Sequence, residues 1–129
     1  MKLKTLGVVI AAGTVAATLY ANNADLPPAA TKQGVTYERD IKAIFERSCL
    51  KCHGPEKPKG KVSLHTLEAT LASNVKNKVF KPGSSAESSV VKAIARLNED
   101  DAMPPEGKGK PLTGEEIGLI RAWIDQGTK

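Results

Sequence analysis

The sequence predicts an all-α fold. Three segments of the 129-residue chain place apolar side chains at the three-to-four-residue spacing of an amphipathic helix. Two of these segments begin with the residue pattern of a capping box, which marks the start of a helix. No alternating strand pattern, hairpin turn or internal repeat stands out between them. Together these observations favour helices joined by loops over any fold that contains a sheet.

The N-terminal segment, residues 1–21, has the pattern of an export signal. Two lysines precede an uncharged, mostly apolar stretch that ends at Leu19, and cleavage is expected after Ala21, with Ala24 as the second candidate. An uncleaved membrane anchor is the alternative. The stretch is shorter than the roughly 20 residues that a spanning helix needs. We therefore expect export to the periplasm and no stable membrane insertion after cleavage.

Residues 22–34 are expected to form a flexible tether, because they contain Pro27-Pro28, small residues and no apolar periodicity. The remaining residues, 35–129, are long enough for one domain. The hydrophobic core of a domain this small is marginal by itself.

The first predicted helix runs from about Thr36 to the two cysteines of the chain. Tyr37, Ile41, Ile44 and Phe45 fall on one face of a helix with 3.6 residues per turn. Thr36 is the expected N-cap, since its hydroxyl can accept a hydrogen bond from a free N–H of the first turn.

A second helix is predicted after Ser84, because Ser84 and Glu87 have the spacing of a capping box. Its apolar face consists of Val90, Val91, Ile94 and Leu97. A shorter helix is expected near Thr66–Leu71, in the loop region between the first and second helices.

The third predicted helix begins at a second capping box, formed by Thr113 and Glu116. Its apolar residues are Ile117, Leu119, Ile120, Trp123 and Ile124. Gly127 is the expected C-terminal stop, because glycine readily adopts the left-handed conformation that ends many helices.

The two cysteines are followed at once by a histidine, in the order Cys49-Leu50-Lys51-Cys52-His53. This spacing is that of a c-type haem attachment site, in which each thiol forms a thioether with one vinyl group and the histidine binds the iron. We therefore expect one haem c, attached covalently through Cys49 and Cys52 and ligated by His53. A buried porphyrin would also supply the apolar volume that the small domain lacks.

Three other readings of the cysteine pair are open. An exported protein could join the pair in a disulfide. A thioredoxin-like redox centre is a second possibility, although no βαβ pattern accompanies the motif. A zinc site would need four ligands and would have to use Cys49, Cys52, His53 and His65 together.

A His53-ligated iron leaves a sixth position that a second residue could fill. Met103 is the one methionine that would remain after signal cleavage, and it precedes two prolines in a stiff segment between predicted helices. A thioether from this segment is the expected ligand. His65 is the rival, and a lysine ligand or an open position are further alternatives.

The charge pattern is a weaker guide to partners. The formal net charge is +5, but no basic run is interleaved with aromatic residues, so nucleic-acid binding is not expected. Six lysines near the motif and after Met103 could attract acidic redox partners: Lys51, Lys57, Lys59, Lys61, Lys108 and Lys110. Acidic residues interrupt this basic field.

The chain resembles class I cytochrome c domains, and in particular the planctomycete-type cytochrome c domains of exported bacterial proteins. The matching segments are Thr36–Ile41, Cys49–Glu56, Pro82-Gly83, Met103–Pro105, Leu112–Ile117 and Trp123–Gly127. The resemblance implies a cytochrome c fold, with three main helices around the haem and crossing N- and C-terminal helices. It also implies iron ligation by His53 and Met103, and electron transfer.

The expected function is that of an exported monohaem electron carrier that exchanges single electrons with a donor and an acceptor protein, and not that of an enzyme. The alternative is the electron-transfer haem subunit of a larger dehydrogenase or oxidoreductase complex. A haem enzyme or gas sensor with an open iron is less favoured. No distal acid and base pair accompanies the motif, which counts against peroxidase chemistry. The sequence carries no pattern that indicates an oligomeric state.

Overall fold

The computed structural model describes residues 25–129, and the predicted signal peptide lies outside the described residues. The described part of the chain is helical and contains no strand, which confirms the all-α class. Its α-helices are α1 (Lys42–Ser48), α2 (Leu50–His53), α3 (Leu67–Ala72), α4 (Ser89–Ile94) and α5 (Gly114–Asp125). Short helical turns are η1 (Tyr37–Ile41), η2 (Lys59–Lys61), η3 (Val75–Asn77), η4 (Ser85–Glu87) and η5 (Glu99–Asp101).

The first predicted helix is present as η1 followed directly by α1. The predicted face of Tyr37, Ile41, Ile44 and Phe45 is buried, so the periodicity located it correctly. Thr36 occupies the N-cap position, but its hydroxyl makes no capping bond. The carboxylate of Asp40 caps this end instead, because it accepts a hydrogen bond from the Thr36 backbone N–H at 2.9 Å.

Helix α5 confirms the prediction from its capping box. The Thr113 hydroxyl accepts from the Glu116 backbone N–H at 3.2 Å, and the Glu116 carboxylate accepts from the Thr113 N–H at 3.0 Å. The side chains of Ile120, Trp123 and Ile124 are fully buried. Two of the four backbone N–H groups that lack a partner within the helix, those of Thr113 and Glu116, are thus bonded by side chains of the capping box.

The prediction that the second helix starts after Ser84 was wrong. A separate turn, η4, follows Ser84, and α4 begins only at Ser89. The reason is tertiary: the Ser85 hydroxyl and backbone N–H both donate to the carboxylate of Asp125, at 2.9 and 2.7 Å. These bonds fix the turn against α5. Helix α4 also ends at Ile94, so Leu97 lies beyond it and is exposed.

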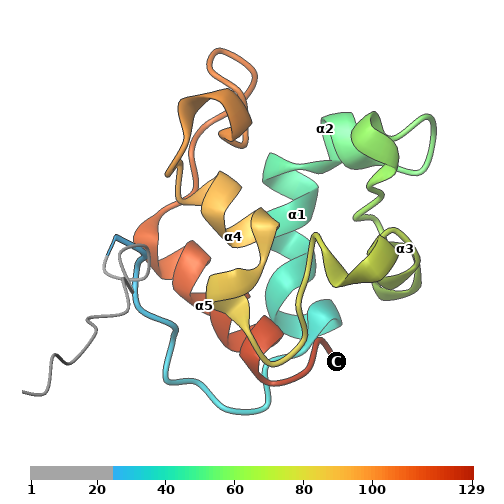
Figure 1. Ribbon diagram of the computed structural model, residues 1–129. Coiled ribbons are helices and arrows are strands. Elements are labelled where there is room, and N and C mark those ends of the chain that lie inside the picture. Colours follow the sequence, from blue (N-terminus) through green and yellow to red (C-terminus); the bar gives the residue numbers. More distant parts are fainter. Residues whose placement is uncertain (1–24) are drawn as a thin grey trace, which may run out of the picture.

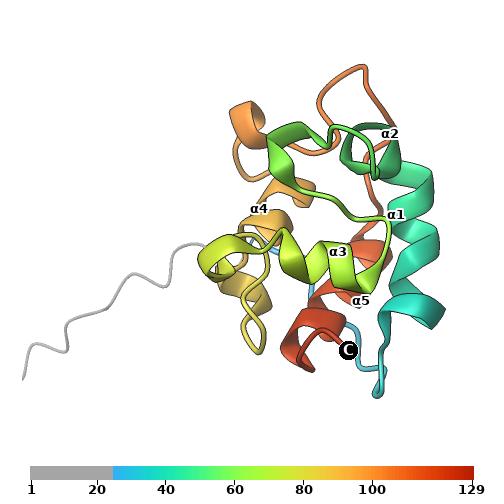
Figure 2. The ribbon, with the colours of Figure 1, turned by 90° about the vertical axis from the view of Figure 1, so that its right-hand side faces the viewer.

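The short helix expected near residues 66–71 is α3. Its N-cap is Thr66, whose hydroxyl accepts from the Ala69 backbone N–H at 3.0 Å. The segment from α2 to α3 contains the short turn η2, and the stretch after η2 runs to α3 in the foreground of Figure 2.

Helix α5 is the element against which η1, η4 and α4 pack (Figure 1). The start of η1 lies beside the C-terminus, since the Tyr37 N–H donates to the Lys129 carbonyl at 2.7 Å. At the opposite end, Arg47 of α1 forms an ion pair with Glu116 of α5. The η1–α1 segment therefore runs antiparallel to α5.

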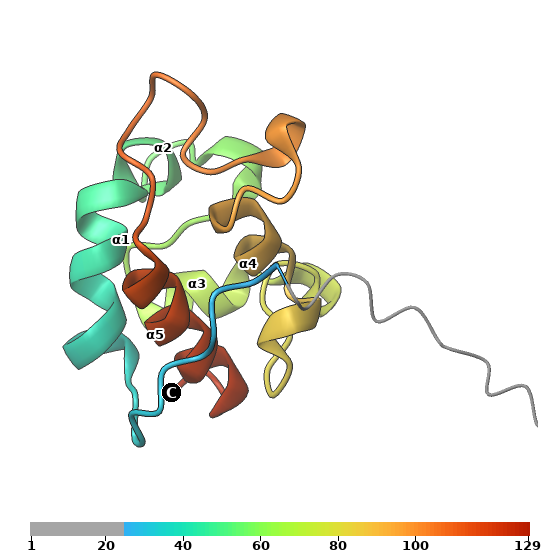
Figure 3. The ribbon, with the colours of Figure 1, turned by 90° about the vertical axis from the view of Figure 1, so that its left-hand side faces the viewer.

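Residues 25–34 lie along α5, where the sequence predicts a flexible tether (Figure 3). The Ala30 N–H donates to the Gly118 carbonyl at 2.9 Å, and the Gln126 side chain donates to the Lys32 carbonyl at 2.7 Å. A side chain at position 118 would not fit, because its Cβ would lie 2.6 Å from the nearest backbone carbonyl oxygen of this segment. We call residues 25–34 the N-terminal strap.

None of the helices within residues 25–129 is both long and apolar enough to cross a membrane.

Candidate functional site

The Cys-x-x-Cys-His motif lies where α1 ends and α2 begins. Cys49 is the C-cap of α1, and its carbonyl accepts hydrogen bonds from the backbone N–H groups of Cys52 at 3.1 Å and His53 at 2.9 Å. This single turn sets the spacing of both thiols and the imidazole, with Cys49 as the N-cap of α2 and His53 as its last residue. Both cysteines are free thiols and only partly exposed.

The ring of His53 is held by a backbone carbonyl. Its Nδ1 lies 2.9 Å from the Val62 carbonyl oxygen, so the tautomer with hydrogen on Nδ1 donates this bond. The other ring nitrogen, Nε2, is then left with a lone pair for a metal. The partner carbonyl therefore comes from the loop that follows the motif.

The segment that carries the Val62 carbonyl is itself fixed on several sides. The Leu64 N–H donates to the His53 carbonyl at 2.8 Å, which makes the contact with α2 reciprocal. The buried hydroxyl of Tyr37 donates to the Leu64 carbonyl at 2.6 Å. The first helix and the motif are thus joined through this segment, which defines the orientation of the imidazole.

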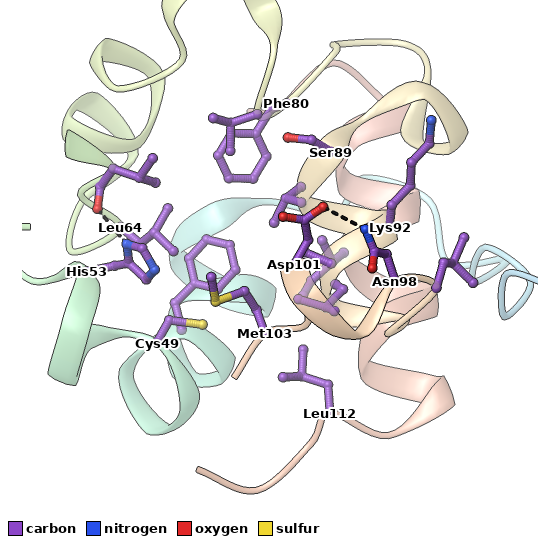
Figure 4. Close-up of a pocket in the computed structure, with 18 residues that line it drawn as sticks. Cys49, His53, Leu64, Phe80, Ser89, Lys92, Asn98, Asp101, Met103 and Leu112 are labelled. Carbon is purple, nitrogen blue, oxygen red and sulfur yellow. Dashed lines mark hydrogen bonds between the residues drawn. The ribbon is translucent and has the colours of Figure 1, made fainter. Parts of the chain in front are cut away.

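A cavity of about 650 Å³ opens beside His53 (Figure 4). Its buried apolar lining includes Phe45, Leu64, Phe80, Ile94, Leu112 and Ile120. Its polar side chains, including those of Lys92, Asn98 and Asp101, come from exposed positions on α4 and the segment that follows it. The cavity is therefore apolar in its depth and polar at its rim.

A second cavity of about 360 Å³ adjoins the first. The two share six lining residues: Cys49, His53, Val62, Ile94, Met103 and Leu112. The second cavity adds Cys52 and three lysines, at positions 51, 59 and 108. Both volumes lie within the range of about 300–1,000 Å³ that is usual for cofactor sites.

Met103 lines both cavities, in the loop between η5 and α5. Its backbone N–H donates to the Ala93 carbonyl of α4 at 3.0 Å, and the residue is 38% exposed. The rival ligand, His65, lines neither cavity, and its Nδ1 lies 2.8 Å from the Ser63 hydroxyl. The fold thus brings Cys49, Cys52, His53 and Met103 to one connected hollow, and it leaves His65 outside.

The geometry weakens the other readings of the cysteines. Burial raises the pKa of the Cys49 thiol to about 11, whereas a thioredoxin-like centre needs a lowered pKa. Within residues 25–129, no three His, Cys, Asp or Glu side chains gather as they would around a zinc ion.

Comparison with known families supports the haem-attachment reading of the motif. Residues 49–107 match the family model of Planctomycete cytochrome C. This match confirms the resemblance that the sequence carries, and a cytochrome c domain implies haem c. Neither curated proteins nor solved structures gave a match to the chain.

The residues of the site fit a covalently bound haem. Two thiols stand at the required spacing, an imidazole nitrogen is free beside them, and an apolar hollow of sufficient size adjoins all three. Bound haem would supply a one-electron iron couple at this place. Cys49 and Cys52 would hold its edge and His53 its iron.

Two features of the site have no signal in the sequence. The Val62 carbonyl belongs to the backbone, and any residue at that position could supply it. The loop that contains Met103 is held by the end of α4. No residue pattern in the sequence indicates that these two segments are in contact. Both would have required knowledge of how the helices pack.

Proposed function

We propose that the protein is an exported monohaem c-type cytochrome, in which the iron is ligated by His53 and Met103 and carries single electrons between redox proteins. The observation that carries this proposal is the convergence of four side chains on one apolar hollow. The two thiols and the imidazole come from the turn into α2, and the thioether comes from a separate loop.

The surrounding residues support electron transfer with little rearrangement. His53 is oriented by the Val62 carbonyl, so its ligating nitrogen is already in place before the iron changes charge. The buried apolar wall excludes water from the depth of the hollow. A thioether ligand favours the reduced iron and gives a higher potential than a second histidine would.

The mouth of the hollow suggests how partners would approach. Lys51, Lys59 and Lys108 line the side nearest the cysteines, and Asp101, the last residue of the acidic turn Glu99–Asp101, lines the main cavity. Such a separation of charge favours one orientation of a charged partner. We therefore propose transient docking of a redox protein with an acidic face on the lysine side, in the periplasm.

The test is the isolation of the protein after expression with working haem-maturation machinery. We expect a mass above that of the mature polypeptide by one haem, a pyridine haemochrome spectrum of c type, and a low-spin ferric spectrum with a sulfur-to-iron charge-transfer band. A colourless protein with the mass of the bare polypeptide would refute haem attachment. High-spin ferric haem and rapid binding of CO after reduction would instead indicate an open iron, as in a haem enzyme or gas sensor.

A further inference from the structure

Helices α4 and α5 end with the same hydrogen-bond pattern. At the end of α5, the Gly127 N–H donates to the Ile124 carbonyl and the Thr128 N–H to the Trp123 carbonyl, both at 3.0 Å. This is a Schellman motif, in which the residue after the C-cap adopts a left-handed conformation. Gly127 has a φ of 97°, which glycine adopts without strain.

Helix α4 ends in the same motif, but with arginine in the position of the glycine. The Arg96 N–H donates to the Ala93 carbonyl at 3.0 Å, and the Leu97 N–H donates to the Lys92 carbonyl at 3.2 Å. Arg96 has a φ of 57°, a region that a residue with a Cβ adopts only at an energetic cost. Glycine would adopt this conformation at a lower energetic cost, so the backbone alone gives no reason for an arginine at this position.

The side chain of Arg96 reaches the loop that contains Met103. Its Nη1 donates to the Pro104 carbonyl at 2.8 Å, and this bond is partly buried. The Ala93 carbonyl of the same helix end also accepts from the Met103 N–H at 3.0 Å. The end of α4 therefore binds the backbone on both sides of the Met103 side chain.

Ala102 and Pro104, on either side of Met103, are also buried, but the loop that follows Pro104 has little support. Residues 105–111 are exposed. Within this stretch, the Lys108 N–H donates a hydrogen bond to the Pro105 carbonyl at 3.0 Å. Two glycines, Gly107 and Gly109, lie in the same stretch. Without the anchor at its start, such a loop has many conformations open to it, and the position of the thioether would be lost among them.

We propose that Arg96 is a positioning residue that holds the Met103 thioether at the iron, an inference that rests on the proposed function. It acts through the Pro104 carbonyl and lines neither cavity. The left-handed backbone of Arg96 sets the direction from which the guanidinium reaches this carbonyl. The arginine thus couples the end of α4 to the sixth position of the iron.

The test compares three variants of the haem-bearing protein. Arg96→Gly removes the guanidinium and relieves the backbone strain, so it should fold as well as the parent protein. Arg96→Lys keeps one donor that can reach the carbonyl. Arg39→Gln is the matched control, because it removes an exposed guanidinium that does not line the hollow.

We expect Arg96→Gly to weaken or abolish the sulfur-to-iron band and to accelerate CO binding to the reduced protein roughly tenfold to a hundredfold. Helical circular dichroism and the covalent haem should be unchanged. Arg96→Lys should recover part of the band, and Arg39→Gln should leave the band and the CO rate as in the parent.

An unchanged band and CO rate in Arg96→Gly would overturn the role of Arg96 alone, provided that the parent protein shows the band. A parent protein without the band would overturn the Met103 assignment and, with it, the role of Arg96. If Arg96→Gly lost the band together with its helical content, the residue would have a structural role only.

Discussion

At the scale of single residues, the contact between His53 and Val62 sets the chemistry of the site. The acceptor is a backbone carbonyl, which can only accept a hydrogen bond and therefore places the hydrogen of the neutral ring on Nδ1. Since the carbonyl takes Nδ1, the nitrogen that faces the hollow is Nε2. Hydrogen bonding at Nδ1 also makes Nε2 a better donor to a metal.

The Met103→Ala substitution tests the second ligand. We expect loss of the sulfur-to-iron band and a lower reduction potential, because the sixth position would lose its soft ligand. The measurements are a near-infrared spectrum of the ferric protein and a redox titration. His65→Ala is the control and should leave both unchanged, since His65 lies outside the hollow. The opposite result, with the band lost only in His65→Ala, would assign the ligand to His65.

Prediction from sequence succeeds at this scale where the chemistry is local. The positions of Cys49, Cys52 and His53 depend on a spacing that one turn of backbone satisfies, so the sequence was sufficient to group them. Met103 could be proposed because few sulfur ligands were available. Arg96 could not, since its partner is a carbonyl eight residues away that is brought near only by the end of α4.

At the scale of elements, the start of α5 depends on side chains that replace missing backbone partners. Thr113→Ala removes the hydroxyl that accepts from the Glu116 N–H, and we expect a loss of about 1 kcal/mol in the free energy of unfolding. Denaturant titration followed by circular dichroism measures this loss.

Thr36→Ala is the matched control for this substitution. Thr36 also occupies an N-cap position, but its hydroxyl makes no capping bond, so we expect a smaller loss. Equal losses in the two variants would show that the capping bond of Thr113 adds nothing to stability.

The elements also show where periodicity fails as a guide. The faces of the first and third helices were located correctly, because each packs in a continuous apolar interior. The start of α4 was misplaced, since the bonds between Ser85 and Asp125 fix a separate turn that sequence spacing cannot reveal. The N-terminal strap contacts α5 mostly through its backbone. Such contacts leave no side-chain pattern in the sequence, so the sequence predicted a tether.

At the scale of the whole molecule, two carboxylates tie distant parts of the chain together. Asp40 is only 3% exposed and binds Lys32 of the N-terminal strap. This contact, and then the hydrogen bond from the Thr36 N–H, lowers the pKa of Asp40 well below its usual range. Glu116 links α5 to Arg47 of α1.

The pKa of Glu116 is also lowered. Burial raises it, but the hydrogen bonds from the Thr113 N–H and from Arg47 outweigh this effect. For both carboxylates the charged form is therefore favoured by folding. The resulting stabilisation is fully present above the unfolded-state pKa of about 4 and is lost as the pH falls through the lower folded-state values.

We therefore expect the thermal midpoint of the protein to decrease as the pH falls below about 4. The double variant Asp40→Asn and Glu116→Gln should have a lower midpoint at neutral pH and a weaker decrease in acid. A second double variant, Glu56→Gln and Glu106→Gln, changes two exposed carboxylates and should follow the parent. Parallel curves for all three proteins would contradict the assignment to these carboxylates.

The hollow occupies the centre of a small domain, so the haem is expected to contribute to folding as well as to redox chemistry. Cys52→Ser removes one of the two attachment points. We expect a sharp decrease in covalent haem and in the yield of folded protein, measured by haem-stained gels and circular dichroism. Normal folding of the haem-free chain, with the thermal midpoint of the haem-bearing protein, would contradict a core that depends on the porphyrin.

The position of Trp123 gives the molecule a built-in optical reporter. It is the sole tryptophan of the chain and is fully buried, and its ring lies 5.6 Å from that of Phe80 and 6.2 Å from that of Phe45, centroid to centroid. Both phenylalanines line the main cavity, so a porphyrin held against them would accept the excitation energy of the indole. The folded, haem-bearing protein should then emit almost no fluorescence under ultraviolet excitation, and its emission should return as the chain unfolds.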